Sequence, residues 1–249
     1  MKQKNDAYGQ ELRAYYNKKK SYEIVERDDG FIDSSSGAPA YFSGFRHWPE
    51  IQKKAIAFAK GRILDVGSGA GRVSLYLLKK GHDVTAIDNS QLAVTICRKR
   101  GIRKAKLLPI ENIGKLKSGY FDTLIMYGNN FGLFGSCKKA KILLKKFFRI
   151  TSPGALIIAE SNDPYKTKDP IHLAYHKFNR KRGRMAGQLR IRVRFRNFIG
   201  CWFDYLLVSG DEMKKILKDT GWKIKKFINS GRSSYIAVIE KMNYHGAER

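Results

Sequence analysis

The sequence predicts an α/β fold in which a mostly parallel sheet carries helices on both faces. From Gly61 onward, short apolar strands alternate with amphipathic helices across short connections, which is the pattern of a parallel sheet. A glycine-rich turn over residues 67–71 joins the first of these strands to its helix. With 249 residues, 43% of them hydrophobic, the chain can bury the core of one such domain, residues 1–249.

The leader, residues 1–60, precedes the alternating series. Residues 6–20 are expected to form a helix, because Tyr8, Leu12 and Tyr15 recur at helical spacing. We expect an extended piece over 22–25, the turn Asp28-Asp29-Gly30, a loop over 34–39 and a second helix over 48–60. We interpret this leader as a helical lid over the glycine-rich turn, and a simple packing extension is the alternative.

The alternating core covers residues 61–160. Its expected strands are residues 63–66, 83–87, 106–108, 121–127 and 155–160. Its expected helices are residues 72–80, 90–100 and 138–150. The turn Ser152-Pro153-Gly154 is expected to precede the last strand.

The alternation ends after residue 160. Residues 161–188 are irregular and polar, with a short helix after Pro170, and strands over 189–198 and 201–208 are close enough to pair as an antiparallel ribbon. We interpret residues 161–208 as an inserted cap over a substrate. In the last part, residues 209–249, we expect a helix over 211–220 and a hairpin of strands 222–228 and 235–241.

The composition is strongly basic, with 49 Lys and Arg against 22 Asp and Glu and a formal net charge of +27. Such a surface attracts nucleic acid, anionic membranes or acidic small molecules. No apolar run approaches the roughly 20 residues of a membrane helix, and the first residues lack the apolar core of a signal peptide. We therefore expect a cytoplasmic protein without a membrane partner. Three cysteines far apart in the sequence make no metal-binding pattern, and no metal site is expected: Cys97, Cys137 and Cys201.

The residues around the glycine-rich turn favour a nucleotide-like ligand. A strand, a glycine turn and a helix N-terminus present unpaired amide N–H groups. Asp88 ends the next strand, where an acid can accept both hydroxyl groups of a ribose. Arg72 stands where the dinucleotide fingerprint requires a third glycine, which disfavours NAD. Asp65 would repel a pyrophosphate and suits a cationic ligand such as S-adenosylmethionine (SAM), which has a sulfonium, an ammonium and no phosphate.

The run from Ile63 to Arg72, ILDVGSGAGR, together with Asp88 resembles the first two motifs of the class I SAM-dependent methyltransferases. Residues 109–113 resemble the segment that this family places near the adenine, with Pro109 in place of the usual Asp. Residues 121–131 resemble its fourth strand and the loop that follows it. The likeness covers about residues 50 to 160 and implies a Rossmann-like seven-stranded sheet of order 3-2-1-4-5-7-6, with the seventh strand antiparallel.

The resemblance also implies a SAM site at the carboxyl ends of the first, second and fourth strands. The residues that it assigns to cofactor binding are Asp65, Gly67, Ser68, Gly69, Asp88, Asn89, Ile110, Glu111, Tyr127, Gly128 and Asn129. A purely structural glycine turn and a nicotinamide site are the alternatives.

No catalytic base follows from the sequence. Asn129 can orient the amino group of SAM or a polar atom of a substrate, but Gly-Asn-Asn is also common in turns. On the helix after Pro170, the candidates for acid–base or binding roles are His172, Tyr175 and His176. A polar linker with packed aromatic residues is the alternative for these three.

Four arginines alternate with other residues in the predicted ribbon: Arg190, Arg192, Arg194 and Arg196. On a strand they share one face. Turned toward the site, they would bind a carboxylate, a phosphate or an RNA backbone. Turned outward, they would form the solvated face of an edge ribbon.

We expect a SAM-dependent methyltransferase that modifies O, N or C of an acceptor. A small metabolite, for which an acidic group is one option, is favoured by the lid and the cap. Ribosomal or transfer RNA is the second hypothesis, because of the net charge and the basic runs at 18–20, 98–100 and 180–184. A SAM-binding protein without catalysis is the third. No feature of the sequence indicates an oligomeric state.

Overall fold

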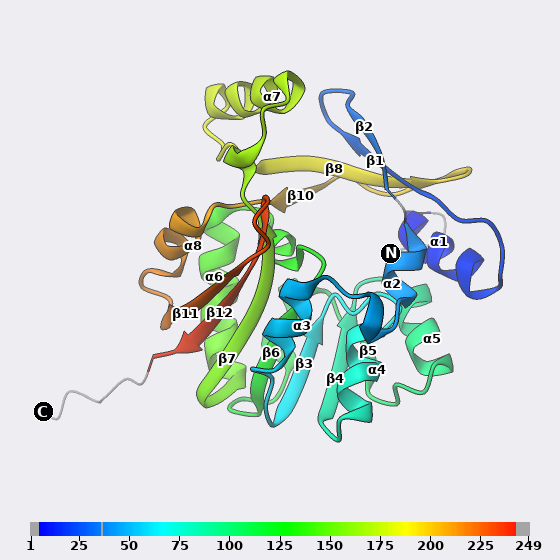
Figure 1. Cartoon of the computed structure of the whole chain (residues 1–249), viewed down its shortest axis with the longest axis vertical. Helices are drawn as coiled ribbons and strands as arrows, with labels where there is room; N and C mark the ends of the chain where they lie inside the picture. Colours follow the sequence, from blue (N-terminus) through cyan, green and yellow to red (C-terminus); the bar gives the residue numbers. More distant parts are fainter. Residues whose placement is uncertain (1–4, 36, 243–249) are drawn as a thin grey trace, which may run out of the picture.

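The computed structural model describes residues 5–35 and 37–242, which form a seven-stranded and a five-stranded sheet with surrounding helices (Figure 1). The strands of the larger sheet are β3 (Arg62–Val66), β4 (Asp83–Asp88), β5 (Ala105–Leu107), β6 (Phe121–Met126), β7 (Thr151–Asn162), β11 (Trp222–Asn229) and β12 (Ser234–Lys241). Their spatial order is β5-β4-β3-β6-β7-β12-β11. This is the predicted order 3-2-1-4-5-7-6, and β12 is antiparallel to both of its neighbours.

Helices cover both faces of the larger sheet because its strands are apolar on both sides. Leu64 of β3 and Leu124 of β6 pack against α6 (Cys137–Ile150) and α8 (Gly210–Leu217). On the opposite face, Ile63 and Ile125 pack against α3 (Glu50–Ile56) and α4 (Arg72–Lys79). Beside α4, α5 (Gln91–Lys99) packs on β4 and β5. The predicted α/β architecture is therefore confirmed.

The second sheet combines two parts of the chain that lie far apart in the sequence. Its strands are β1 (Glu23–Arg27), β2 (Ile32–Ser35), β8 (Gln188–Phe195), β9 (Phe198–Ile199) and β10 (Phe203–Leu206). They pair in the order β10-β8-β1-β2, with β9 on β8, and Figure 1 shows this sheet across one end of the larger one. The expected ribbon is thus not separate from the leader, because β1 pairs with the backbone groups that a two-stranded ribbon leaves open on β8.

The leader also differs in detail from the expected lid of helices. The first helix, α1 (Ala7–Tyr16), is shorter than expected, and Lys18 has a left-handed φ of 59° just beyond its end. The expected loop over 34–39 includes the end of β2 and the start of α2 (Ala38–Phe42). Ala7 and Ala14 of α1 pack against Phe195 of β8, so the leader and the insertion form one unit.

The insertion holds more regular structure than the sequence indicated. Its helix α7 (Pro170–Lys181) has 12 residues, and the Asp169 side chain caps it by accepting a hydrogen bond from the Ile171 amide at 2.8 Å. The expected turn before the fifth strand lies inside β7, where Gly154 has a φ of 66° and the pairing with β6 changes register. Short 3-10 turns complete the chain: η2 (Phe45–His47), η3 (Ile110–Lys115), η4 (Asn130–Phe134) and η5 (Pro164–Lys166).

Across residues 5–35 and 37–242, none of the helices combines the length and the apolar character that crossing a bilayer requires.

Replacing Phe195 by Ala should weaken the attachment of α1 to the second sheet. Phe195 is 2% exposed, and loss of a buried phenyl ring costs about 3–5 kcal/mol. Urea unfolding would measure this change, with Phe203→Ala as the control. Phe203 is 37% exposed in the same sheet, so its replacement should cost less than about 1 kcal/mol. Equal losses in the two variants would contradict this account of how α1 is held.

Candidate active site

The glycine-rich turn lies at the carboxyl end of β3 and is fixed by backbone hydrogen bonds. Gly67, Gly69 and Gly71 have φ values of 70°, 54° and 80°, which glycine adopts without strain. The amides of Gly67 and Ser68 donate to the Ile87 carbonyl of β4 at 2.9 and 3.0 Å. A Cβ atom on Gly69 would lie only 2.5 Å from the Tyr8 hydroxyl of α1. Glycine is therefore needed both for the backbone and for the close approach of α1.

Asn130, which was not among the residues assigned to cofactor binding, holds the glycine-rich turn from the side of β6. Its Nδ2 atom donates to the carbonyls of Val66 and Gly67 at 2.9 and 3.0 Å. A Cβ atom on Gly67 would lie 2.6 Å from the same Nδ2 atom. The only signal for this role was the position of Asn130 beside the predicted Asn129.

Two buried carboxyl groups flank the turn. Asp88 accepts hydrogen bonds from the amides of Gly69 and Ser90, both at 2.9 Å. Asp65 accepts from the Ser74 hydroxyl at 2.6 Å. Burial raises the pKa of each carboxyl group to about 6, against the hydrogen bonds that lower it. Each would therefore gain from a cation or from hydroxyl donors placed beside it.

A buried polar chain connects the start of α4 with the ends of β6 and β7. The Arg72 guanidinium donates to Gln52 at 2.8 Å, and Gln52 donates to Glu160 at 2.7 Å. The same oxygen of Glu160 accepts from the Gly128 amide at 2.7 Å. The end of the fifth strand at Glu160 was expected to face this site, but Gln52 was not predicted, because only the fold brings α3 to the end of β7.

The second sheet reaches the end of β6 through Tyr205 of β10. Its hydroxyl donates to the Asn129 carbonyl at 2.6 Å. Asn129 has a left-handed φ of 61°, and its Oδ1 atom is buried without a hydrogen-bond partner among the described residues. A buried acceptor of this kind calls for a donor from a bound molecule.

On the side of α1, tyrosines and carboxylates lie together. The rings of Tyr8 and Tyr41 meet edge to face at 5.2 Å, and the Tyr41 hydroxyl donates to Glu23 at 3.2 Å. Glu11 accepts from the Ala38 amide at 2.7 Å through Oε1. Burial and the charge of Glu23 raise the pKa of Glu11 to about 7.

The remaining predicted cofactor residues lie around the same edge of the larger sheet. The Ser68 hydroxyl is 3.8 Å from the Cys97 sulfur, and Tyr127 donates to the Gln52 carbonyl at 3.0 Å. Asn89 is exposed directly after Asp88. Beyond β5, η3 begins at Ile110 and Glu111.

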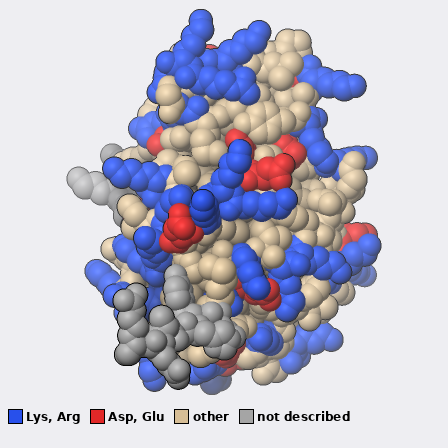
Figure 2. Space-filling view, turned by 90° about the vertical axis from the view of Figure 1, so that its left-hand side faces the viewer, with Lys and Arg blue, Asp and Glu red and all other residues tan. Residues whose placement is uncertain are grey.

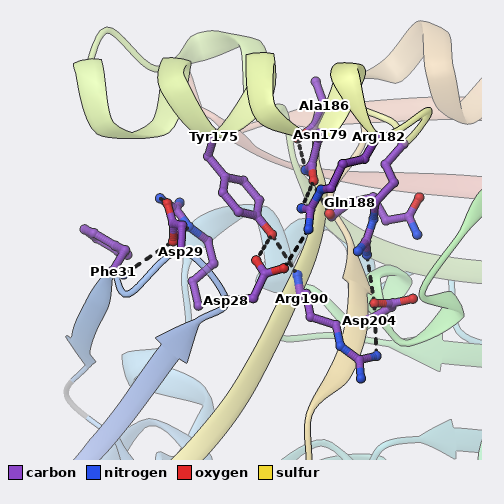
Figure 3. A network of polar contacts seen from close by, with 12 residues as sticks. Asp28, Asp29, Phe31, Tyr175, Asn179, Arg182, Ala186, Gln188, Arg190 and Asp204 are labelled. Carbon is purple, nitrogen blue, oxygen red and sulfur yellow. Dashed lines mark hydrogen bonds and ion pairs between the residues drawn. The ribbon is translucent and has the colours of Figure 1, made fainter.

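The three candidates on α7 make their contacts elsewhere, and Figure 3 shows those of Tyr175. The Tyr175 hydroxyl donates to Asp28 at 2.6 Å and accepts from the Arg190 amide at 3.1 Å. His172 lies 3.0 Å from the Arg27 guanidinium, measured between Nδ1 and Nη1. The His176 ring packs 6.0 Å from the ring of Tyr165. These side chains connect α7 with the β1–β2 turn, with β8 and with η5, and none of these contacts involves the glycine-rich turn.

The arginine series of β8 lies on the face opposite to Val193 and Phe195, which pack on α1. Acids of the neighbouring strands pair with three of its members. Arg192 and Arg194 contact Glu26 of β1 at 2.8 and 3.2 Å, and Arg190 contacts Asp204 of β10 at 3.4 Å. The fourth, Arg196, lies beyond the end of β8 with a φ of 52°.

The sheet order, the glycine-rich turn and Asp88 together define a Rossmann-like methyltransferase fold. Residues 64–159 match the family model described as a methyltransferase domain. A solved SAM-dependent methyltransferase from Bacteroides fragilis, in complex with S-adenosyl-L-homocysteine (SAH), superimposes with a TM-score of 0.82. It is 24% identical, and the alignment covers 98% of both chains. At this identity the likeness shows the fold.

Two curated relatives add to this picture. A tabtoxin biosynthesis enzyme of Pseudomonas amygdali pv. tabaci is 24% identical over 230 residues, which are 91% of this chain and 79% of the relative. A glycine/sarcosine N-methyltransferase of Halorhodospira halochloris is 27% identical over 145 residues, 56% of this chain and 52% of the relative. The chain spans less than two thirds of the length of several other curated relatives that it matches. The match over residues 64–159 and the fold are thus those of a SAM-dependent methyltransferase domain, as the sequence motifs predicted.

Replacing Tyr175 by Phe should lower the free energy of unfolding by about 1–2 kcal/mol, because a buried donor and acceptor are lost. Since the contacts of Tyr175 are with Asp28 and Arg190, calorimetry should find the SAH affinity changed by less than about twofold. Tyr205→Phe is the matched variant, and it should weaken SAH binding because Asn129 loses its hydrogen bond. Unchanged stability of Tyr175→Phe with a large loss of methyl transfer would give Tyr175 a part in the reaction.

Proposed function

We propose that this protein transfers a methyl group from SAM to a small metabolite. The observation that carries the proposal is the cover over the glycine-rich turn. Tyr8 of α1 stands over Gly69, and Tyr205 of β10 bonds to Asn129. Side chains from two layers thus close on the ends of β3 and β6, which suits a small acceptor better than a nucleic-acid helix. The names of the tabtoxin and glycine/sarcosine relatives also point to small molecules.

In this proposal, the cofactor lies along the carboxyl ends of β3, β4 and β6. Asp88 would accept hydrogen bonds from the ribose hydroxyl groups, and η3, which begins at Ile110, would border the adenine. The unpartnered Oδ1 of Asn129 is an acceptor that suits the cofactor's ammonium group. SAM supplies a methyl group activated by its sulfonium. The protein contributes orientation and exclusion of water, which in-line displacement requires most.

Several arginines of the basic runs that favoured an RNA acceptor form hydrogen bonds or ion pairs within the protein. Arg98 donates to the Ala105 carbonyl at 2.8 Å, and Arg182 and Arg184 pair with Asp28 and Asp204 at 2.9 and 2.8 Å. Figure 2 shows Lys and Arg spread over one face, with Asp and Glu among them. Such a mixed surface favours solubility as much as it favours nucleic acid.

Transfer of label from methyl-labelled SAM to a cell extract tests the proposal. After the reaction, the extract is separated into metabolite, RNA and protein pools. We expect the label in the metabolite pool. Label in RNA would overturn the proposal in favour of the second hypothesis, and tight SAH binding without transfer to any pool would support a binding protein.

Asp88→Asn should weaken SAH binding by about 1–3 kcal/mol, because the amide replaces charge-assisted hydrogen bonds with neutral ones. Asp83→Asn is the matched control, since Asp83 begins the same strand and pairs with Lys104 at 2.6 Å on the surface. Isothermal titration calorimetry measures both. Equal affinity of Asp88→Asn and the unaltered protein would rule out this placement of the ribose.

The affinity for SAH should also depend on pH. The pKa of Asp88 is raised to about 6 by burial, and the charged form is the better acceptor for ribose hydroxyls. The dissociation constant should therefore be constant above about pH 7 and rise as the pH falls through 6. Asp65 titrates in the same range, so Asp88→Asn should remove only part of the dependence. A flat profile between pH 5 and 8 would contradict the assignment.

A further inference from the structure

We infer that Glu11 and Glu23 form the recognition site for a cationic group of the acceptor, so that the substrate is an amine. This inference rests on the proposed function, since it names the class of small metabolite. The two residues come from α1 and β1, and both are buried, with exposed fractions of 0% and 7%. No motif of the sequence indicated either of them.

The first argument is an unsatisfied carboxylate oxygen. Oε1 of Glu11 accepts from the Ala38 amide at 2.7 Å, whereas Oε2 is buried and has no hydrogen-bond partner among the described residues. No Lys or Arg of the described residues forms an ion pair with Glu11. A buried carboxylate oxygen without a partner costs stability, and an ammonium group could donate the missing hydrogen bond.

The second argument is the charge of the neighbouring group. Gly37 lies between the two residues. A Cβ atom built on Gly37 would lie 3.0 Å from the Glu23 backbone nitrogen and would also touch the Glu11 carboxylate. The charge of Glu23 raises the pKa of Glu11, as expected when two acids share a buried place. A cation between them would relieve this repulsion, whereas an acidic acceptor would increase it.

The third argument is that two tyrosines connect the carboxylates with the glycine-rich turn. Tyr41 donates to Glu23 at 3.2 Å and meets the ring of Tyr8, whose hydroxyl stands over Gly69. A cation bound to the carboxylates would thus lie beside the tyrosine rings, whose faces attract positive charge. One tyrosine layer separates the carboxylates from the turn, so the acceptor would lie next to the methyl donor.

The arginines do not favour an acidic acceptor. Arg190, Arg192 and Arg194 pair with Asp204 and Glu26 on the face of β8 that is turned away from α1. Arg72 is engaged with Gln52 and lies over the Trp48 ring at 4.8 Å. The protein is therefore basic on its surface, with a formal charge of +27, and acidic beside the glycine-rich turn.

SAM itself carries an ammonium group, so the experiment must separate the two sources of positive charge. Metabolites from a cell extract are divided on a cation exchanger at pH 7 into retained and unretained fractions. Each fraction is incubated with methyl-labelled SAM and the protein. The variants are Glu11→Gln, Glu23→Gln and the control Glu26→Gln, which removes a carboxylate from β1 on the face that bears the arginines.

We expect label in the retained fraction. Glu11→Gln should reduce this labelling at low metabolite concentration by about tenfold or more, and Glu26→Gln should leave it unchanged. The SAH dissociation constant of Glu11→Gln should stay within about twofold of the unaltered value. The melting temperature of the unliganded Glu11→Gln protein should rise, because the amide can donate a hydrogen bond where a charge was unsatisfied. If Glu11 only stabilised the fold, Glu11→Gln would instead lower the melting temperature.

Other results overturn the inference in distinguishable ways. Label in the unretained metabolites would exclude an amine acceptor but leave a small-molecule methyltransferase. A tenfold loss of SAH affinity in Glu11→Gln and Glu23→Gln would assign the carboxylates to the cofactor. Label only in RNA or protein, or in no pool, would overturn the proposed function and the inference together. If Glu11→Gln fails to fold, Glu23→Gln provides the same comparison.

Discussion

The pairing of β1 with β8 is the contact on which the arrangement of the site depends. It joins Ile24 to Arg194 and Arg27 to Ile191, so a segment near the N-terminus and a late insertion become one sheet. One face of β8 then packs on α1, and Tyr8 of α1 lies over Gly69. β10 forms the edge of this sheet next to β8, and its Tyr205 donates a hydrogen bond to the Asn129 carbonyl. Loss of this pairing would detach β1 from the insertion, and α1 would then be held by its packing on α5 through Leu12, Ala93 and Ile96.

The larger sheet could be predicted from the sequence because its signals are local. The strand over 63–66, its glycine turn and Asp88 lie within one strand–helix–strand unit, and apolar strands with short connections leave few alternative topologies. The second sheet could not be predicted in the same way. Residues 22–25 and 189–198 each suggested an extended segment, but nothing local indicates that strands separated by more than 150 residues pair.

The residues of the candidate site also fall into two groups, those that belong to local motifs and those that only the fold brings together. Asp65, Asp88 and the glycines belong to motifs with fixed spacing, so they could be named from the sequence. Gln52 becomes part of the site only because α3 lies at the end of β7, where it donates to Glu160. For Tyr175 and the histidines of α7, residue type suggested acid–base chemistry. Their contacts connect α7 with the β1–β2 turn and, for His176, with η5. Residue type alone does not distinguish these roles, because a buried tyrosine needs a hydrogen-bond partner in either case.

Net charge and site charge have opposite signs in this protein, and this difference bears on its chemistry. The excess of Lys and Arg lies where solvent screens it. Around the glycine-rich turn, by contrast, the buried groups are mostly acidic, and burial raises the pKa of Asp65, Asp88 and Glu11. Interactions are stronger there because water is largely excluded. The local field at the turn therefore favours a cationic cofactor and a cationic acceptor, whatever the surface attracts.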